Sequence, residues 1–130
     1  MNILIVEDSR FLRMSNERAL ARAGYGVITA ADGEEGLRLA RESKPDLVIL
    51  DLMLPKLSGR QVLRELRRLP ETASIPVMIV SSLPQCNDKR LIDEGATSYF
   101  EKAGLLLDKG PDTFVQTVTR MLSQSKAAGA

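Results

Sequence analysis

The segment that decides the fold is DLVILDLMLP, residues 46–55. Four apolar residues precede Asp51, and the chain turns apolar again directly after it. A strand that is buried on both faces of a parallel sheet reads as a continuous apolar run, and open α/β sheets bind ligands at the carboxyl ends of their strands. Asp51 is therefore a candidate site residue. Taken alone, the segment also fits a purely structural role, in which Asp51 caps the strand or starts a turn.

Length and composition favour a single globular domain. The chain has 130 residues, 44% of them hydrophobic, so it can bury a core of its own. We expect the domain to span residues 1–124 and the small, polar tail at 125–130 to be disordered. Lys and Arg number 18 and Asp and Glu number 17, so the net charge does not indicate nucleic acid or an anionic membrane as a bulk partner. A strand-like segment starts at residue 2, which leaves no room for a signal peptide or membrane span and predicts a cytoplasmic protein.

The chain contains no histidine and a single cysteine. This composition excludes Ser-His-Asp hydrolysis, histidine metal sites and Cys-His catalysis. Cys86 cannot form an internal disulfide, and we interpret it as incidental. The chemistry that remains is that of carboxylates, lysines and hydroxyl groups.

Short runs rich in Val and Ile alternate with stretches of helical spacing, which predicts βαβ units and a parallel sheet. The expected strands are residues 2–6, 26–30, 46–50, 75–80 and 97–100. Helices are expected over 9–23, after a cap at Asp32, around the apolar stripe at 62–69, after Pro84 and over 114–122. The fold class is thus α/β, with a strand followed by a helix five times.

Polar residues follow four of these five strands. Glu7 and Asp8 follow the first, Asp51 ends the third, Ser81 and Ser82 end the fourth, and Lys102 follows the fifth. Because the carboxyl ends of parallel strands lie on one edge of the sheet, these residues should converge on one crevice. Scattered surface charges would have no reason to fall in this way.

Three carboxylates in one crevice require a positive partner. Two carboxylates about 4 Å apart repel each other by roughly 4 kcal/mol at an effective dielectric constant of about 20. Lys102 supplies one positive charge, and oxygen ligands without His or Cys select Mg²⁺ or Mn²⁺ as the second. Asp51 would then be a nucleophile that accepts a phosphoryl group, and the Ser81 hydroxyl would bond a phosphoryl oxygen.

The motifs IVEDSR, LVILDLMLP, VMIVSS and SYFEK, taken in this order, resemble the receiver domain of bacterial two-component response regulators, in its stand-alone form. The resemblance covers essentially the whole chain. It implies a flavodoxin-like, doubly wound (βα)5 sandwich with strand order 2-1-3-4-5. It also implies that a histidine kinase, a phosphotransfer protein of a phosphorelay or a small phosphodonor phosphorylates Asp51.

The resemblance further implies roles for individual residues. Mg²⁺ would be bound by Asp8 and Asp51, by Glu7 through water, and by the backbone carbonyl of Met53. The phosphoryl group would contact Lys102 and Ser81, with Ser82 beside it, and Tyr99 would turn inward as Ser81 moves. The face made by the fourth helix, fifth strand and fifth helix would then change its affinity for an effector protein or for a second copy of the chain.

Each of these residues also has a structural interpretation. Glu7 and Asp8 could cap the first helix, and Lys102 could be a solvated surface lysine. Ser82 could take the place of Ser81 after a shift of one residue. Tyr99 could be a half-buried core aromatic residue with its hydroxyl at the surface.

Two departures from the family pattern affect the expected function. Ala103 stands where the family usually has a proline after the lysine, which keeps open a pseudo-receiver that interacts without phosphorylation. Met53 and Leu83 are apolar where a polar side chain could guide attacking water, so phospho-Asp51 should hydrolyse slowly. An aspartyl-nucleophile phosphatase would need an acid two residues after Asp51, which Met53 cannot supply. We therefore expect a signalling domain with self-phosphorylation and slow autodephosphorylation only.

Overall fold

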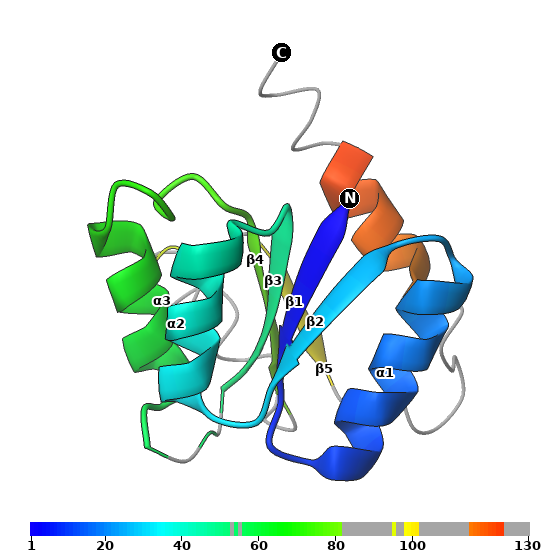
Figure 1. Cartoon of the computed structure of the whole chain (residues 1–130), viewed down its shortest axis with the longest axis horizontal. Helices are drawn as coiled ribbons and strands as arrows, with labels where there is room; N and C mark the ends of the chain where they lie inside the picture. Colours follow the sequence, from blue (N-terminus) through cyan, green and yellow to red (C-terminus); the bar gives the residue numbers. More distant parts are fainter. Residues whose placement is uncertain (53, 55, 82–94, 96–97, 102–114, 124–130) are drawn as a thin grey trace.

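The chain forms a five-stranded parallel sheet of order β2-β1-β3-β4-β5 (Figure 1). The computed structural model describes residues 1–52, 54, 56–81, 95, 98–101 and 115–123. The strands are β1 (Asn2–Val6), β2 (Gly26–Ala30), β3 (Leu47–Asp51), β4 (Val77–Ser81) and β5 (Ser98–Glu101). The strand order expected from the family resemblance is confirmed.

The last three strands begin and end later than their apolar runs predict. Asp51 still belongs to β3, because it pairs with Val80 of β4. The backbone N–H of Ile75 donates to the Thr72 carbonyl, which places Ile75 in a turn, and β4 begins only after Pro76. The apolar runs therefore locate these strands correctly, whereas local turn bonds decide their ends.

Three helices are described with both of their ends: α1 (Arg10–Arg22), α2 (Gly33–Ser43) and α3 (Gly59–Arg68). Each begins after a residue whose side chain accepts a backbone N–H from the first turn, namely Ser9, Asp32 and Ser58. Residues 115–123 are helical, and all but residue 123 lie within the helix predicted at 114–122. The helix expected after Pro84 lies outside the described residues. No helix in the described part of the chain is both long and apolar enough to cross a membrane.

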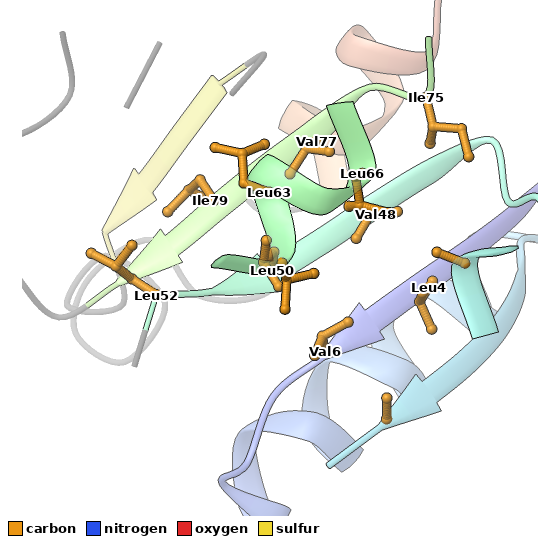
Figure 2. Packing of buried hydrophobic residues seen from close by; sticks show 13 residues of the cluster. Leu4, Val6, Val48, Leu50, Leu52, Leu63, Leu66, Ile75, Val77 and Ile79 are labelled. Carbon is orange, nitrogen blue, oxygen red and sulfur yellow. The ribbon is translucent and has the colours of Figure 1, made fainter. Parts of the chain in front are cut away.

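Helices cover both faces of the sheet, with α2 and α3 on one side and α1 and residues 115–123 on the other (Figure 1). Val48 and Leu50 of β3 belong to the core under α2 and α3, which Figure 2 shows. Leu47 and Ile49 belong to the core under α1. Because successive side chains of a strand point to opposite faces, a strand between two cores has to be apolar at every position. This explains the unbroken run before Asp51.

Asp32 makes the folding of α2 sensitive to acid. Its Oδ1 accepts a hydrogen bond from the Glu35 backbone N–H at 2.8 Å, and Lys56 Nζ lies 3.6 Å from its Oδ2. The Glu35 N–H, with a further contribution from Lys56, holds the pKa of Asp32 below its ordinary value of 3.8. The folded protein therefore binds this proton less tightly than the unfolded chain.

We predict that the stabilisation from Asp32 is fully present above pH 3.8 and is lost as the pH falls through the lower, folded-state pKa. Urea unfolding of the wild type and of Asp32→Asn should differ at pH 6, and the difference should shrink as the pH falls below 3.8. Glu34→Gln, which removes an exposed charge from the same helical turn, is the matched control. A stability difference between wild type and Asp32→Asn that stays constant across this pH range would contradict the prediction.

Candidate functional site

Three carboxylates meet where β1 and β3 end. One side-chain oxygen from each of Glu7, Asp8 and Asp51 lies within 4.8 Å of the other two. β1 and β3 pair with Val6 opposite Leu50, so the residues that follow this pair lie side by side. Glu7 is 3% exposed and Asp51 is 2% exposed, whereas Asp8 is exposed. The structure thus brings together two buried acids and one that faces solvent.

The connection between β1 and α1 fixes Glu7. Its backbone N–H donates to the Ala30 carbonyl at 3.0 Å, which extends the pairing of β1 with β2. Its Oε2 accepts the backbone N–H of Ser9 at 3.0 Å, just before α1 begins. The amino-terminal end of a helix carries a partial positive charge, which stabilises carboxylates placed beside it. The chain therefore offsets part of the charge of this cluster with its own backbone.

The connection between β3 and α3 fixes Asp51 from the other side. The N–H of Leu52 donates to the Val80 carbonyl at 3.2 Å, and the N–H of Gly59 donates to the Leu52 carbonyl at 2.9 Å. Ser58 and Gln61 form a capping box at the start of α3, in which each side chain accepts the backbone N–H of the other residue. Main-chain bonds on both sides thus hold the backbone that carries Asp51.

The carboxylate cluster fits a hard divalent cation. Like charges within 4.8 Å repel by roughly 3 kcal/mol or more per pair at an effective dielectric constant of about 20. The donor atoms are all carboxylate oxygens, which suit Mg²⁺ or Mn²⁺ and do not suit a softer metal. Asp8 is exposed, so a cation here would keep water ligands or share a phosphate oxygen.

The other predicted site residues are placed only in part. Ser81 ends β4 opposite Glu101, and Tyr99 lies in β5 opposite Ile79. The backbone of Ser81 is thus one residue beyond Val80, the partner of Asp51. Three further predicted residues lie outside the described part of the chain: Met53, Ser82 and Lys102. Their roles stay predictions.

Two residues beside the site were not anticipated from the sequence. Gly59 is buried directly against the backbone of Asp51. The Ser-Gly pair before an apolar stripe indicates a helix start, but nothing in it reveals this close approach. Arg13 donates to the Glu7 carbonyl at 2.9 Å. No sequence signal separates Arg13 from the other arginines of α1, because the contact depends on how the helix packs.

The model of the response regulator receiver domain matches residues 3–106. Protein PilH of Pseudomonas aeruginosa is 36% identical over 122 residues, which cover 93% of this chain and 97% of PilH. The alkaline phosphatase synthesis transcriptional regulatory protein PhoP of Bacillus subtilis is 41% identical over 101 residues, 77% of this chain and 41% of PhoP. The transcriptional regulatory protein AfsQ1 of Streptomyces coelicolor is 38% identical over 110 residues, 82% of this chain and 48% of AfsQ1. The chain thus spans less than half the length of the two transcriptional regulators.

Solved structures agree with the fold. A CheY-like response regulator receiver domain protein from Methanospirillum hungatei superimposes with a TM-score of 0.85 at 23% identity, over 98% of this chain and 97% of that one. The chemotaxis protein CheY4 of Vibrio cholerae superimposes with a TM-score of 0.80 at 28% identity, over 92% of this chain and 96% of that one. The family match, the PilH relationship and the shared architecture together lead to one conclusion: the chain belongs to the response regulator receiver domain family.

Proposed function

We propose that this receiver domain accepts a phosphoryl group on Asp51, in a reaction that requires Mg²⁺, and that phosphorylation switches its binding to other proteins. The observation that carries the proposal is the carboxylate cluster at the ends of β1 and β3, with Asp51 buried at its base and Asp8 open to solvent. We propose residues 1–124 as the receiver domain. Its place of action would be the cytoplasm, where kinases and small phosphodonors meet it.

In this proposal Asp8 and Asp51 would hold Mg²⁺, with Glu7 acting through water and the Met53 carbonyl as a further ligand. The bound cation would supply positive charge next to the transferring phosphoryl oxygens. A carboxylate oxygen of Asp51 forms a bond to phosphorus while the bond from phosphorus to the donor nitrogen or oxygen breaks. The leaving group keeps that electron pair. The backbone bonds around Leu52 keep Asp51 in place for this in-line attack.

Further roles rest on the family resemblance. Lys102 would pair with the phosphoryl oxygens, and the hydroxyl of Ser81, with Ser82 beside it, would donate to them. Tyr99 would turn inward when Ser81 moves. We propose that the surface made by the segment after Pro84, by β5 and by residues 115–123 then changes its affinity for partners.

The output of this switch would be protein association rather than catalysis on an outside substrate. The partners would be a sensor histidine kinase or a phosphotransfer protein upstream and an effector protein downstream, with a phosphorylation-dependent homodimer as a further product. Hydrolysis of phospho-Asp51 would be slow, because Met53 and Leu83 offer no polar group to guide water.

The test is an intact-mass measurement after incubation with acetyl phosphate and Mg²⁺. We expect the wild type to gain the mass of one phosphoryl group, and to gain none when EDTA replaces Mg²⁺. Asp51→Asn should gain none under either condition. Asp46→Asn is the matched control, because Asp46 is an exposed carboxylate directly before β3, at the end opposite Asp51. It should be phosphorylated like the wild type.

Two results would contradict the proposal. Phosphorylation of Asp51→Asn to the wild-type level would place the acceptor elsewhere. A wild type that neither gains mass nor binds beryllofluoride with Mg²⁺ would leave a pseudo-receiver, the alternative that Ala103 after Lys102 keeps open.

A further inference from the structure

Among the described hydrogen bonds, Arg13 is the one residue of α1 whose side chain binds the backbone of a residue in the carboxylate cluster. Its Nη1 donates to the Glu7 carbonyl oxygen at 2.9 Å, from a half-buried position in the first turns of the helix. A charged donor makes a stronger hydrogen bond than a neutral one, and partial burial reduces the competition from water. The guanidinium therefore holds the peptide group that joins Glu7 to Asp8.

This bond is one of three described hydrogen bonds at Glu7. Its N–H is bound to Ala30 and its Oε2 accepts the N–H of Ser9, as described above. With Arg13 on the carbonyl, the backbone is tied directly before Asp8 and directly after it. Asp8 itself is exposed, so little side-chain packing is available to orient its carboxylate. The described contacts that bear on its orientation toward Glu7 and Asp51 are the bonds that Arg13 and Ser9 make to Glu7.

The charge and the hydrogen bond of Arg13 act on a bound cation in opposite directions. A guanidinium next to the cluster repels Mg²⁺, so removing its charge should tighten metal binding if charge alone matters. The hydrogen bond orients a metal ligand, so removing it should weaken metal binding. The sign of the change in affinity therefore distinguishes the two roles.

We propose that Arg13 is a positioning residue that orients Asp8 for metal binding through the Glu7 carbonyl. The inference rests on the proposed function, since it assumes that the cluster binds Mg²⁺. Arg13 would touch neither the cation nor the phosphoryl group. It acts through the main chain. When Arg13 is replaced, the loss of its hydrogen bond weakens Mg²⁺ binding more than the loss of its positive charge strengthens it.

The experiment compares Mg²⁺ affinity by isothermal titration calorimetry in three variants of the full chain. Arg13→Met loses the donor and the charge, and we expect about tenfold weaker binding. Arg13→Lys keeps a charged donor and should bind within about threefold of the wild type, an intermediate value because a lysine does not reproduce the geometry of arginine. Arg10→Met removes an exposed charge from the first residue of the same helix. It should bind Mg²⁺ as tightly as the wild type or slightly more tightly.

A second measurement separates positioning from a general loss of structure. In EDTA, the backbone amide signal of Asp8 in nitrogen-15 NMR spectra should shift clearly in Arg13→Met and much less in Arg10→Met. Thermal unfolding in EDTA checks that the variants are folded. If Arg13→Met does not fold, Arg13→Gln, which retains a shorter amide donor, takes its place with the same expected direction.

The outcomes separate this inference from the proposed function. Wild-type protein that binds no Mg²⁺ overturns both. Wild-type protein that binds Mg²⁺, with an Arg13→Met variant that binds it equally well or better, overturns the role of Arg13 alone. The role of Arg13 is supported if Arg13→Met binds Mg²⁺ more weakly, Arg13→Lys largely restores the affinity and Arg10→Met does not lower it.

Discussion

Alanine in place of Gly59 is expected to destabilise the protein by about 3 kcal/mol and to slow phosphoryl transfer to Asp51 about a hundredfold. A Cβ atom at this position would lie 2.7 Å from the Cα of Leu52 and closer still to the Asp51 carbonyl oxygen. Both are backbone atoms at the buried end of β3, so they cannot rotate away. Either α3 or Asp51 must move. Chemical denaturation and the rate of mass gain with acetyl phosphate measure the two effects.

Gly24→Ala is the control for this substitution. Gly24 has a φ of 98°, which strains a residue with a side chain, but a Cβ there would meet no atom within 4 Å. It should lower stability moderately and leave phosphorylation unchanged. Helix propensity alone would make Gly59→Ala stabilising by up to about 1 kcal/mol, since alanine is the better helix former. A more stable Gly59→Ala variant with normal phosphorylation would therefore contradict the close approach of α3 to the acceptor strand.

Arg67→Met is expected to lower the free energy of unfolding by about 3 kcal/mol. Arg67 lies near the end of α3, half-buried, and donates to three backbone carbonyls: Gly95 at 2.9 Å, Ala73 at 3.0 Å and Ile75 at 2.6 Å. Burial lowers the pKa of Arg67, yet a guanidinium stays charged at neutral pH, so all of these bonds have a charged donor. Methionine fills a similar volume and leaves the carbonyls without the donor. Urea unfolding measures the change.

Arg68→Met is the matched control for Arg67. Arg68 is the next residue of α3, and its exposed side chain pairs with Glu65 one turn earlier. Exposed ion pairs contribute little to stability, so we expect Arg68→Met to unfold close to the wild type. Similar losses of stability in the two variants would show that the positive charge at the end of α3 stabilises the protein, rather than the hydrogen bonds from Arg67 to the three carbonyls. Hydrogen exchange of the Ile75 amide, which donates to the Thr72 carbonyl, would locate the effect, because it should rise only in Arg67→Met.

Much of the fold can be predicted from the sequence because its signals are local. The run before Asp51 indicates a strand with a core on each face, and both cores are present. Asp32 indicates a helix cap and acts as one. The meeting of Glu7, Asp8 and Asp51 follows from a general property of parallel sheets, which does not require any side-chain detail. These predictions needed only the identity and order of residues.

The remaining features depend on distances between elements, which no residue pattern encodes. A glycine at a helix start has many explanations, and its contact with the backbone of Asp51 is visible only when α3 is packed. Arg67 is one of two adjacent arginines that look alike in sequence but differ in burial. Arg10 and Arg13, three residues apart in α1, also look alike in sequence but differ in burial. Lys102, Ser82 and Met53 lie outside the described residues, so their roles stay predictions.

The two cores that share β3 also limit how Asp51, the proposed phosphoryl acceptor, can move. If β3 slid by one residue, Val48 and Leu50 would point into the core under α1, and Leu47 and Ile49 would point into the core under α2 and α3. The packing of both cores would then be disrupted. Asp51 therefore cannot transmit a signal by moving along its own strand. If Asp51 is phosphorylated as proposed, the response would have to travel across the strands, toward the neighbouring edge of the sheet at β4 and β5, or outward through the loops.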